Sequence, residues 1–484
     1  MISGPFSFGT ERQTERIASL PQHFYDGGMI ARRPLLTAIA SSVLMPAMAR
    51  CAPAIRRSII VIGAGIAGLA AAVDLRRAGH DVTVIEARNR PGGRIHTSHI
   101  WPGLPIDLGA SWIHGTNGNP VTALAAQAGA TLVETSYDSA QFHIDPLLRA
   151  KGAEDSGDAA MDKLFNRAMR HAAALDEDMS VQAAVSAVAR AEMQDPVQRA
   201  QLDFYLSSHF EQEYGGSTDQ LSARSFEDNE VFEGEDALFP GGYGQIIAHL
   251  AKDIPIRLNH EVRTIAWGGS TVSVGLRDGS LLTADQLLVT VPLGVLKSGT
   301  ITFDPPLPAA KQQAIAKLGM GLLNKHWLRF DRIFWPKDYD WHEYLSAEKG
   351  RWSEWVSLAK VKNTPVLLVF SAADRAHQLE PMHDGEIVAD AMQVVRAMFG
   401  TSAPDPVAAQ ITRWQSDPFA RGSYSFNAVG SSNEDRAALA RTDTAGLYFA
   451  GEALNALYPG TVHGALLSGR QAARQMMKDT RNHD

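Results

Sequence analysis

Five short stretches between residues 59 and 94 decide the fold: Ile59–Ile62 (IIVI), Gly63–Gly68 (GAGIAG), Leu69–Ala78 (LAAAVDLRRA), Val82–Glu86 (VTVIE) and Arg90–Arg94 (RPGGR). The first and fourth are apolar and β-branched, as is typical of buried strands, and the third has helical spacing. A glycine-rich turn between a strand and a helix, with an acid closing the next strand, is the pattern of a dinucleotide site. We therefore predict an α/β fold that contains a Rossmann-like domain.

Each part of that pattern has a physical role. Gly63 permits the tight turn, Gly65 lets the backbone approach a pyrophosphate, and Gly68 lets the helix pack against the strand. The N-terminus of the helix offers unpaired N–H groups to the phosphates. Glu86 lies 23 residues after Gly63, where an acid accepts hydrogen bonds from a ribose. This motif alone does not choose between NAD and FAD.

The next segment makes that choice. Gly92-Gly93-Arg94 is unusual for NAD enzymes, and with it the chain resembles the flavin-containing amine oxidase family along most of its length. The other family-like stretches, in chain order, are Asp107–Gly115 (DLGASWIHG), Phe239–Gly244 (FPGGYG), Val291–Leu296 (VPLGVL), Tyr448–Glu452 (YFAGE) and Tyr458–Ala465 (YPGTVHGA). Within the family, the WIHG and YPGTVHGA stretches most resemble polyamine oxidases and the related histone demethylases.

The resemblance implies an FAD cofactor bound without a covalent link. The chain has one cysteine, Cys51, and the pair matching the flavin-linked cysteine and its tyrosine is Ser423-Tyr424. The cofactor contacts implied by the resemblance are Gly63, Gly65, Gly68, Glu86, Arg94, Ala110, Ser111, Val262, Glu452 and Val462. Arg94 would neutralise the pyrophosphate, and Glu452 would face the ribityl chain. No metal site is expected.

Four residues are candidates for the chemistry: Lys325, Tyr424, His114 and Thr461. Lys325 shares a strand face with two apolar neighbours, which by pattern alone favours an edge lysine that reaches solvent. The resemblance instead implies a lysine that holds a water against flavin N5. It also implies an aromatic wall at Tyr424 and, at Thr461, a departure from the two-aromatic cage of monoamine oxidases. His114 stays open between a structural and a substrate-binding role.

The function implied is oxidation of polyamines, such as spermidine, spermine or their acetylated forms. A hydride would pass to flavin N5, water would hydrolyse the imine, and reoxidation by O2 would release H2O2, with a respiratory electron acceptor as the other route. Only one dinucleotide fingerprint is present, so the electrons should come from the substrate and not from NAD(P)H. The alternative is an L-amino-acid oxidase, or another monoamine oxidase or dehydrogenase of the same family.

Several acids could contact a second ammonium group of such a substrate. They are Glu211, Glu213, Asp228, Glu230 and Glu233, and we interpret most of them as solvated.

The predicted domains are interleaved. The FAD-binding domain would collect residues 56–115, 236–300 and 405–480, and an α+β substrate-binding domain would collect 116–235 and 301–404. Alanines and leucines at helical spacing predict helices over 159–174, 181–191 and 196–208.

Residues 1–49 are predicted to be a twin-arginine signal region. Arg32-Arg33 precedes an apolar run that ends in Ala47-Met48-Ala49, and Met29 is an alternative start. The apolar run is too short to cross a bilayer, so no stable membrane insertion is expected. This pattern predicts a periplasmic protein, and a cytoplasmic one if the segment is an ordinary helix. The net charge of −8 gives no electrostatic footprint for nucleic acid.

Overall fold

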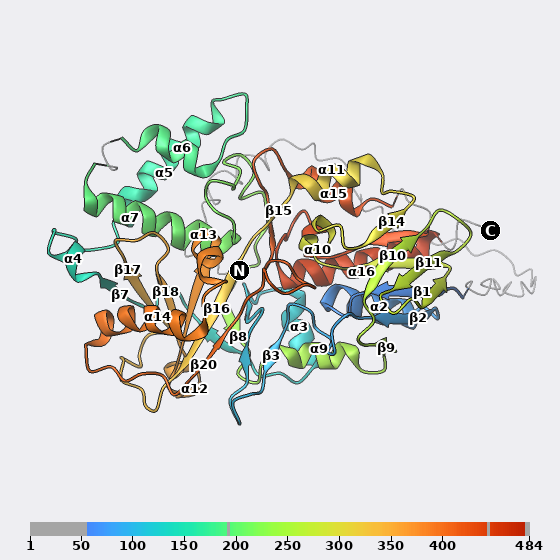
Figure 1. Ribbon diagram of the computed structural model, residues 1–484, viewed down its shortest axis with the longest axis horizontal. Coiled ribbons are helices and arrows are strands. Elements are labelled where there is room, and N and C mark those ends of the chain that lie inside the picture. The colour runs from blue at the N-terminus through green and yellow to red at the C-terminus, as the bar shows by residue number, and fades with distance from the viewer. Residues whose placement is uncertain (1–55, 191–193, 443–445, 480–484) are drawn as a thin grey trace, which may run out of the picture.

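The computed structural model describes residues 56–190, 194–442 and 446–479, so the predicted signal region 1–49 lies outside the described residues. A five-stranded parallel sheet forms one end of the elongated molecule, and a six-stranded mixed sheet forms the other (Figure 1). The predicted α/β fold, with a Rossmann-like domain and a second, interleaved domain, is confirmed.

The parallel sheet is assembled from segments far apart in the chain. Its strands, in order across the sheet, are β22 (Leu447–Phe449), β13 (Gln286–Val289), β1 (Ser58–Ile62), β2 (Asp81–Ile85) and β9 (Ile256–Arg257). Every neighbouring pair is parallel. β1 lies in the middle and is covered on both faces, which explains its continuous apolar run.

Helices cover one face of this sheet: α2 (Ile66–Arg77), α3 (Pro120–Gln127), α9 (Gly244–Ala251) and α16 (Val462–Asp479). α16, which closes the described chain, lies directly against α2 (Figure 1). The two helices approach so closely that a Cβ added at Gly469 would lie 2.1 Å from the backbone oxygen of Ala67.

A four-stranded sheet covers the opposite face. Its strands, in order, are β12 (Leu281–Ala284), β11 (Val272–Leu276), β10 (Val262–Ala266) and β14 (Thr302–Asp304). Ile265 and Val274 pack in one cluster with Ile60 of β1. Three helices lie on this side: α10 (Leu293–Lys297), α11 (Ala309–Lys317) and α15 (Asn433–Ala440). Both faces are therefore closed, and a ligand has access at the carboxyl ends of the strands.

The six-stranded sheet carries the other half of the molecule. Its order is β20 (Ala408–Ile411), β16 (Leu323–Arg329), β19 (Val366–Ala372), β18 (Glu354–Ser357), β17 (Trp341–Leu345) and β7 (Ala140–Ile144). The long helix α14 (Asp384–Phe399) covers one face. Because side chains alternate along a strand, Leu323, Lys325 and Trp327 point to the other face, toward Trp112 and Tyr424.

Helices α5 (Asp158–Ala173), α6 (Val181–Val188) and α7 (Pro196–Leu206) form a separate layer beside this sheet (Figure 1). They match the helices predicted for this part of the chain to within a few residues. α7 continues into a π-helical turn, η2 (Ser207–Glu211), and a last turn, α8 (Gln212–Tyr214).

Short elements complete the fold: β3 (Thr97–Ser98), β4 (Ile106–Asp107), β5 (Trp112–Ile113), β6 (Val133–Thr135), β8 (Asp236–Leu238), β15 (Gly319–Met320), β21 (Ser425–Phe426), α4 (Pro146–Arg149), α12 (Leu358–Lys362), α13 (Ala373–Leu379) and η3 (Glu452–Leu454). In the part of the chain that the structure describes, no helix combines the length and apolar character needed to cross a membrane.

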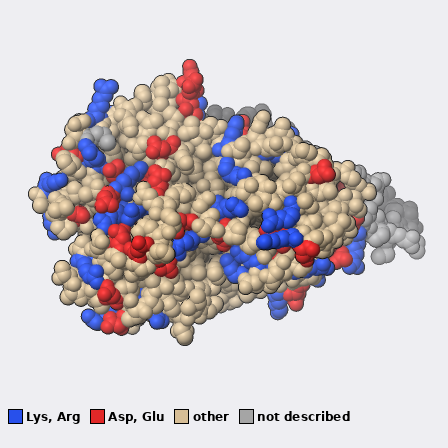
Figure 2. Space-filling model, in the orientation of Figure 1, with Lys and Arg blue, Asp and Glu red and all other residues tan. Residues whose placement is uncertain are grey.

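Acidic and basic side chains are mixed over the face of the molecule shown in Figure 2.

The strands fall largely within the predicted segments, with two differences. β14 lies in 301–404, but it pairs with β10 in the four-stranded sheet that covers the parallel sheet. All five strands of the parallel sheet lie in 56–115, 236–300 or 405–480. β20 also lies in 405–480, but it pairs with β16 at the edge of the six-stranded sheet. The chain therefore crosses between the two sheets a few residues later than the sequence suggests.

The α2–α16 contact generates a stability prediction. Gly469→Ala would place a methyl group against backbone that cannot move aside, so we expect a loss of about 1–3 kcal/mol in the free energy of unfolding. Gly385→Ala is the matched control, because Gly385 is also helical but has open space around its Cβ position. The control should be neutral or stabilising, because alanine is the better helix former. Chemical denaturation measures both, and equal stability of the two variants would contradict the account.

Candidate functional site

A cavity of about 370 Å³ runs from the carboxyl ends of β1 and β2 to the face of the six-stranded sheet. All but one of the predicted site residues line it: Gly63, Gly65, Glu86, Arg94, Ala110, Ser111, His114, Val262, Lys325, Tyr424, Glu452, Thr461 and Val462. The exception is Gly68. The structure thus brings together residues that span 400 positions of sequence.

The glycine-rich turn forms one end of the cavity. Gly63 has φ of +103°, which a side chain would strain, and a Cβ at Gly65 would point into open space. Gly68 serves by packing, because a Cβ there would lie 2.1 Å from the oxygen of Gly63. Thr290 supports the turn from β13, since its Oγ1 lies 2.8 Å from the oxygen of Ile62 as a donor. The roles assigned to the three glycines therefore have a geometric basis here.

Glu86 is buried at the end of β2 and organises this turn. Its Oε2 accepts a hydrogen bond from the N–H of Ala64 at 2.9 Å, and its Oε1 accepts one from the N–H of Arg88 at 2.9 Å. Each carboxylate oxygen has capacity for a further donor, such as a ribose hydroxyl. Glu86 can therefore hold the loop and a ligand at once.

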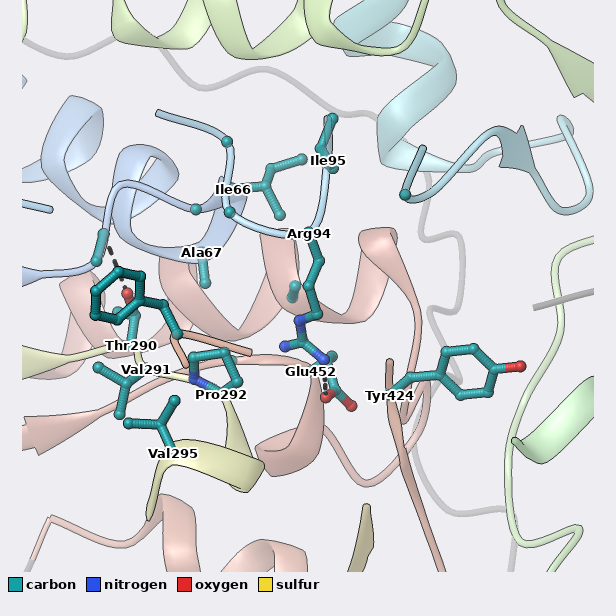
Figure 3. Close-up of a pocket in the computed structure, with 18 of the residues that line it drawn as sticks. Ile66, Ala67, Arg94, Ile95, Thr290, Val291, Pro292, Val295, Tyr424 and Glu452 are labelled. Carbon is teal, nitrogen blue, oxygen red and sulfur yellow. Dashed lines mark hydrogen bonds and ion pairs between the residues drawn. The ribbon is translucent and has the colours of Figure 1, made fainter. Parts of the chain in front are cut away.

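Arg94 and Glu452, which lie far apart in the sequence, form an ion pair across the floor of the cavity. The Nη1 of Arg94 donates to Oε1 of Glu452 at 2.8 Å, and the pair is drawn in Figure 3. Oε2 of Glu452 accepts from Oγ of Ser425 at 2.6 Å and from the N–H of Gly460 at 2.9 Å. Burial raises the pKa of Glu452, but the charge of Arg94 and these hydrogen bonds outweigh it and leave the pKa below its usual value.

These residues fit a flavin dinucleotide. The glycine turn and the start of α2 supply N–H groups, and the guanidinium of Arg94 is a cation beside them. Val291, Pro292 and Val295 give the same cavity an apolar side (Figure 3). A cavity that places an apolar wall beside a phosphate cradle suits FAD.

Lys325 lies on the cavity wall that strand β16 of the six-stranded sheet forms. Its side chain is buried, and Nζ donates to the oxygen of Gly109 at 2.6 Å and to Oγ of Ser111. The ammonium group also lies 5.3 Å from the ring centroid of Trp112. Burial lowers the pKa of Lys325 to about 7, an effect that the nearby Asp107 opposes. Lys325 is therefore a buried amine and not a lysine at a solvent-exposed edge.

Asp107 is the buried counter-charge to Lys325. Burial raises the pKa of Asp107 to about 6, although hydrogen bonds from Thr97 and from the N–H of Tyr243 and the charge of Lys325 act to lower it. The charge of each group therefore influences the ionisation of the other near neutral pH.

Tyr424 forms an aromatic wall of the cavity. Its hydroxyl points away from the Arg94–Glu452 pair (Figure 3) and donates to the oxygen of Gln212 at 2.6 Å. The preceding residue, Ser423, turns its hydroxyl toward β16, where Oγ lies 2.8 Å from the oxygen of Leu323 as a donor and accepts from the N–H of Leu323 at 2.9 Å. The ring of Tyr424 is thus locked in place.

Thr461 has a second role that sequence alone did not show. Its Oγ1 accepts a hydrogen bond from the N–H of Gly464 at 2.8 Å and donates to the oxygen of Tyr458 at 2.9 Å. This is the pattern of a helix N-cap, here at the start of α16. Thr461 lines the cavity, but its hydroxyl is already engaged.

His114 is held at the cavity by an acid. Its Nδ1 lies 2.7 Å from Oδ2 of Asp236, and the N–H of Gly115 donates to Oδ1 of the same residue at 2.9 Å. His463 lies nearby. Its pKa is lowered to about 3, mainly by burial and to a smaller extent by the charge of His114. This position of His114 is compatible with both roles considered for it, structural and substrate-binding.

Other cavity residues had no signal in the sequence. Phe370 and Trp414 line the wall near Lys325, and Trp414 donates from Nε1 to the oxygen of Leu108 at 3.2 Å. They lie 45 residues or more from Lys325 along the chain, so only strand pairing brings them to the site. Among the acids interpreted as solvated, Glu211 proves to be buried and forms an ion pair with Lys349 at 2.7 Å. That interpretation was wrong for Glu211.

Comparisons with known proteins agree with this geometry. The family described as "Flavin containing amine oxidoreductase" matches residues 66–477. Polyamine oxidase 4 of Oryza sativa subsp. japonica is 35% identical over 435 residues, which cover 87% of this chain and 88% of that protein. Protein FLOWERING LOCUS D of Arabidopsis thaliana is 34% identical over 446 residues, which cover 88% of this chain and 56% of that protein.

Lysine-specific histone demethylase 1 homolog 2 of Oryza sativa subsp. japonica is 34% identical, and the match covers 57% of it. The chain thus spans little more than half the length of several of the relatives it matches. A solved structure of putrescine oxidase bound to putrescine has a TM-score of 0.70 at 21% identity, covering 88% of this chain and 99% of that chain. That likeness concerns the fold.

The position of Lys325 generates a prediction. Lys325→Met should slow flavin reduction or reoxidation at least about tenfold, because it removes the amine that manages protons there. Since the pKa of Lys325 is held at about 7, the affected rate in the wild type should titrate near pH 7, with the neutral amine accumulating above it, and the variant should lose this ionisation. Stopped-flow absorbance follows both half-reactions.

The control is Lys337→Met, at an exposed lysine outside the cavity. If Lys325→Met keeps wild-type rates in both half-reactions, the assigned role of Lys325 is wrong.

Proposed function

Because this chain belongs to the flavin containing amine oxidoreductase family, we propose that it is an FAD-dependent amine oxidase whose substrates are polyamines. The proposed substrates are spermidine, spermine and their acetylated forms.

The observation that carries the proposal is a buried amine facing a dinucleotide cradle across one cavity. Lys325, with its lowered pKa, lies beside Trp112, and Tyr424 and the glycine turn line the same cavity. Arg94 lies between the turn and Tyr424 (Figure 3), where its Nη1 donates to the oxygen of Ser423. A lysine is rarely buried without a partner unless the site uses it. The arrangement supports proton handling next to a redox centre.

The chemistry divides between cofactor and protein. Bound FAD would supply a hydride acceptor at N5 for the carbon next to the amine nitrogen. The aromatic faces of Tyr424 and Trp112 would position the amine, as a cation or as the neutral form poised for oxidation. Lys325 would hold a water at Nζ and accept or return its proton, and water would hydrolyse the released imine.

The side chain of Ser423 supports non-covalent binding of FAD. This residue stands where related enzymes carry the flavin-linked cysteine, and its hydroxyl is committed to Leu323. The electron acceptor in this proposal is O2, with release of H2O2, or a respiratory carrier. The twin-arginine pattern in the sequence supports export to the periplasm as part of the same proposal.

Relatives named as polyamine oxidases at about 35% identity favour polyamines over other amines. Relatives named as histone demethylases match nearly as well, so the substrate must be tested directly. L-amino acids and monoamines are the competing small substrates.

The test compares turnover of spermidine, spermine, acetylspermine, n-butylamine and L-leucine by purified holoenzyme. Peroxide release and reduction of an artificial acceptor measure the rate, and mass spectrometry identifies the aldehyde product. We expect kcat/KM for at least one polyamine to exceed that for the monoamine and the amino acid about tenfold or more. Robust oxidation of L-leucine without oxidation of any polyamine would contradict the proposal.

A further inference from the structure

A second buried arginine, Arg436 of α15, lies close to Glu452 without lining the cavity. Its side chain is fully buried, at 0% exposure. Nε donates to Oδ1 of Asn427 at 3.0 Å, and Nη1 donates to Oγ of Ser425 at 2.7 Å and to the oxygen of Ala453 at 3.1 Å. These three acceptors are uncharged, so the guanidinium gains its hydrogen bonds without a carboxylate in direct contact.

Ser425 connects Arg436 to Glu452. Its Oγ accepts from Nη1 of Arg436 at 2.7 Å and donates to Oε2 of Glu452 at 2.6 Å. A hydroxyl group has one proton to donate, and a guanidinium can only donate. The proton of Ser425 is therefore committed to Glu452 while Arg436 is in place.

Glu452 passes this constraint on to the cavity. The same Oε2 accepts a hydrogen bond from the N–H of Gly460 at 2.9 Å, and Gly460, Thr461 and Val462 all line the cavity. Hydrogen bonds to an ionised acceptor are about twice as strong as those to a neutral one. The ionisation and orientation of Glu452 therefore help to place the start of α16 beside the cofactor site.

Arg436 also adds a positive charge beneath the cavity floor. Burial lowers the pKa of Arg436 to about 10, an effect that the charges of Glu452 and Asp435 oppose, so the side chain is a cation at neutral pH. Arg94 pairs with Glu452 at 2.8 Å, and Lys317 lies 3.8 Å from Asp435. Three cations thus face two carboxylates, which leaves the floor with a net positive charge.

Packing alone does not call for a guanidinium at this position. A buried charge costs free energy unless a partner offsets it, and an apolar side chain of similar volume would fill the space without that cost. The contacts of Arg436 lead instead to Glu452 through one hydroxyl group. This arrangement points to an electrostatic role at the cofactor site.

We propose that Arg436 is a positioning residue of the FAD site. It directs the hydroxyl of Ser425 to Glu452, and it adds to the charge of Arg94 in keeping Glu452 ionised as an acceptor at the cavity floor. The inference rests on the FAD site of the proposed function and is independent of which amine is oxidised.

The test compares Arg436→Met with Arg436→Lys. Flavin fluorescence follows the dissociation of FAD on dilution of the holoenzyme at several pH values between 5.5 and 8. We expect Arg436→Met to bind FAD at least about fivefold more weakly than the wild type at pH 8. Arg436→Lys keeps the charge and should recover part of this loss.

The pH dependence separates a charge effect from a packing effect. Arg94, the hydrogen bonds and Arg436 together hold the pKa of Glu452 below its usual value, so removing Arg436 should raise that pKa. Protonated Glu452 is a weaker acceptor for Ser425 and Gly460. The affinity ratio between the wild type and Arg436→Met should therefore grow as the pH falls, and Arg436→Lys should behave more like the wild type.

Lys311→Met is the matched control for loss of a buried cation. Lys311 is also fully buried, and it donates to the oxygens of Leu439 and Arg441 at the end of α15. Its replacement should lower the free energy of unfolding and leave the pH dependence of FAD binding as in the wild type.

Ser425→Ala carries the test if Arg436→Met fails to fold, because it cuts the link and leaves the guanidinium in place. It should weaken FAD binding by at least about threefold. When both variants fold, adding Ser425→Ala to Arg436→Met should cost little more, since both changes break the same link.

Three results would overturn the inference: unchanged FAD affinity in Arg436→Met, a loss of the same size at every pH, or losses that multiply in the double variant. These failures are distinguishable from failure of the proposed function. If the wild type oxidises no polyamine yet its FAD affinity depends on Arg436 in the expected manner, the substrate assignment fails and the role of Arg436 stands.

Discussion

The contact between Arg94 and Glu452 is the interaction on which the rest of the site depends. The two residues lie 358 positions apart, and their ion pair is largely buried. A buried carboxylate needs its charge and all its acceptor capacity matched, and Glu452 achieves this with donors from three segments. The hydrogen bonds to Glu452 therefore hold three segments in one arrangement: the loop after β2 that contains Arg94, the segment that contains Tyr424 and Ser425, and the start of α16.

The cavity differs in charge between the dinucleotide cradle and the six-stranded sheet. Arg94 and the start of α2 make the cradle positive, as phosphates require. Toward the six-stranded sheet, burial lowers the pKa of Lys325 to about 7, so its amine is close to neutrality. The cradle therefore holds a phosphate-bearing cofactor by charge, while the sheet side offers an amine that gains or loses a proton near pH 7.

The dinucleotide half was predictable because its chemistry is local. Gly63, Gly65, Gly68 and Glu86 follow one another at spacings that a strand, turn and helix impose, so a short window of sequence shows them. The features that sequence alone missed depend on pairing between distant segments. Register alone makes Phe370 a neighbour of Lys325, and β20 joined the six-stranded sheet through β16. The capping role of Thr461 is local, since its Oγ1 accepts from the N–H of Gly464, but a threonine before a helix also fits a cavity wall, so the sequence did not single this role out.

The most direct test of this account is a double-mutant cycle on Arg94 and Glu452, read out as the dissociation constant of FAD from flavin fluorescence. Arg94→Met and Glu452→Gln should each weaken FAD binding at least tenfold. Because Arg94→Met leaves a buried carboxylate unmatched, adding Glu452→Gln should recover part of the loss, so that the double variant binds no more weakly than the weaker single variant. Losses that multiply in the double variant, or single variants that bind FAD as the wild type does, would contradict a cofactor site closed by this pair.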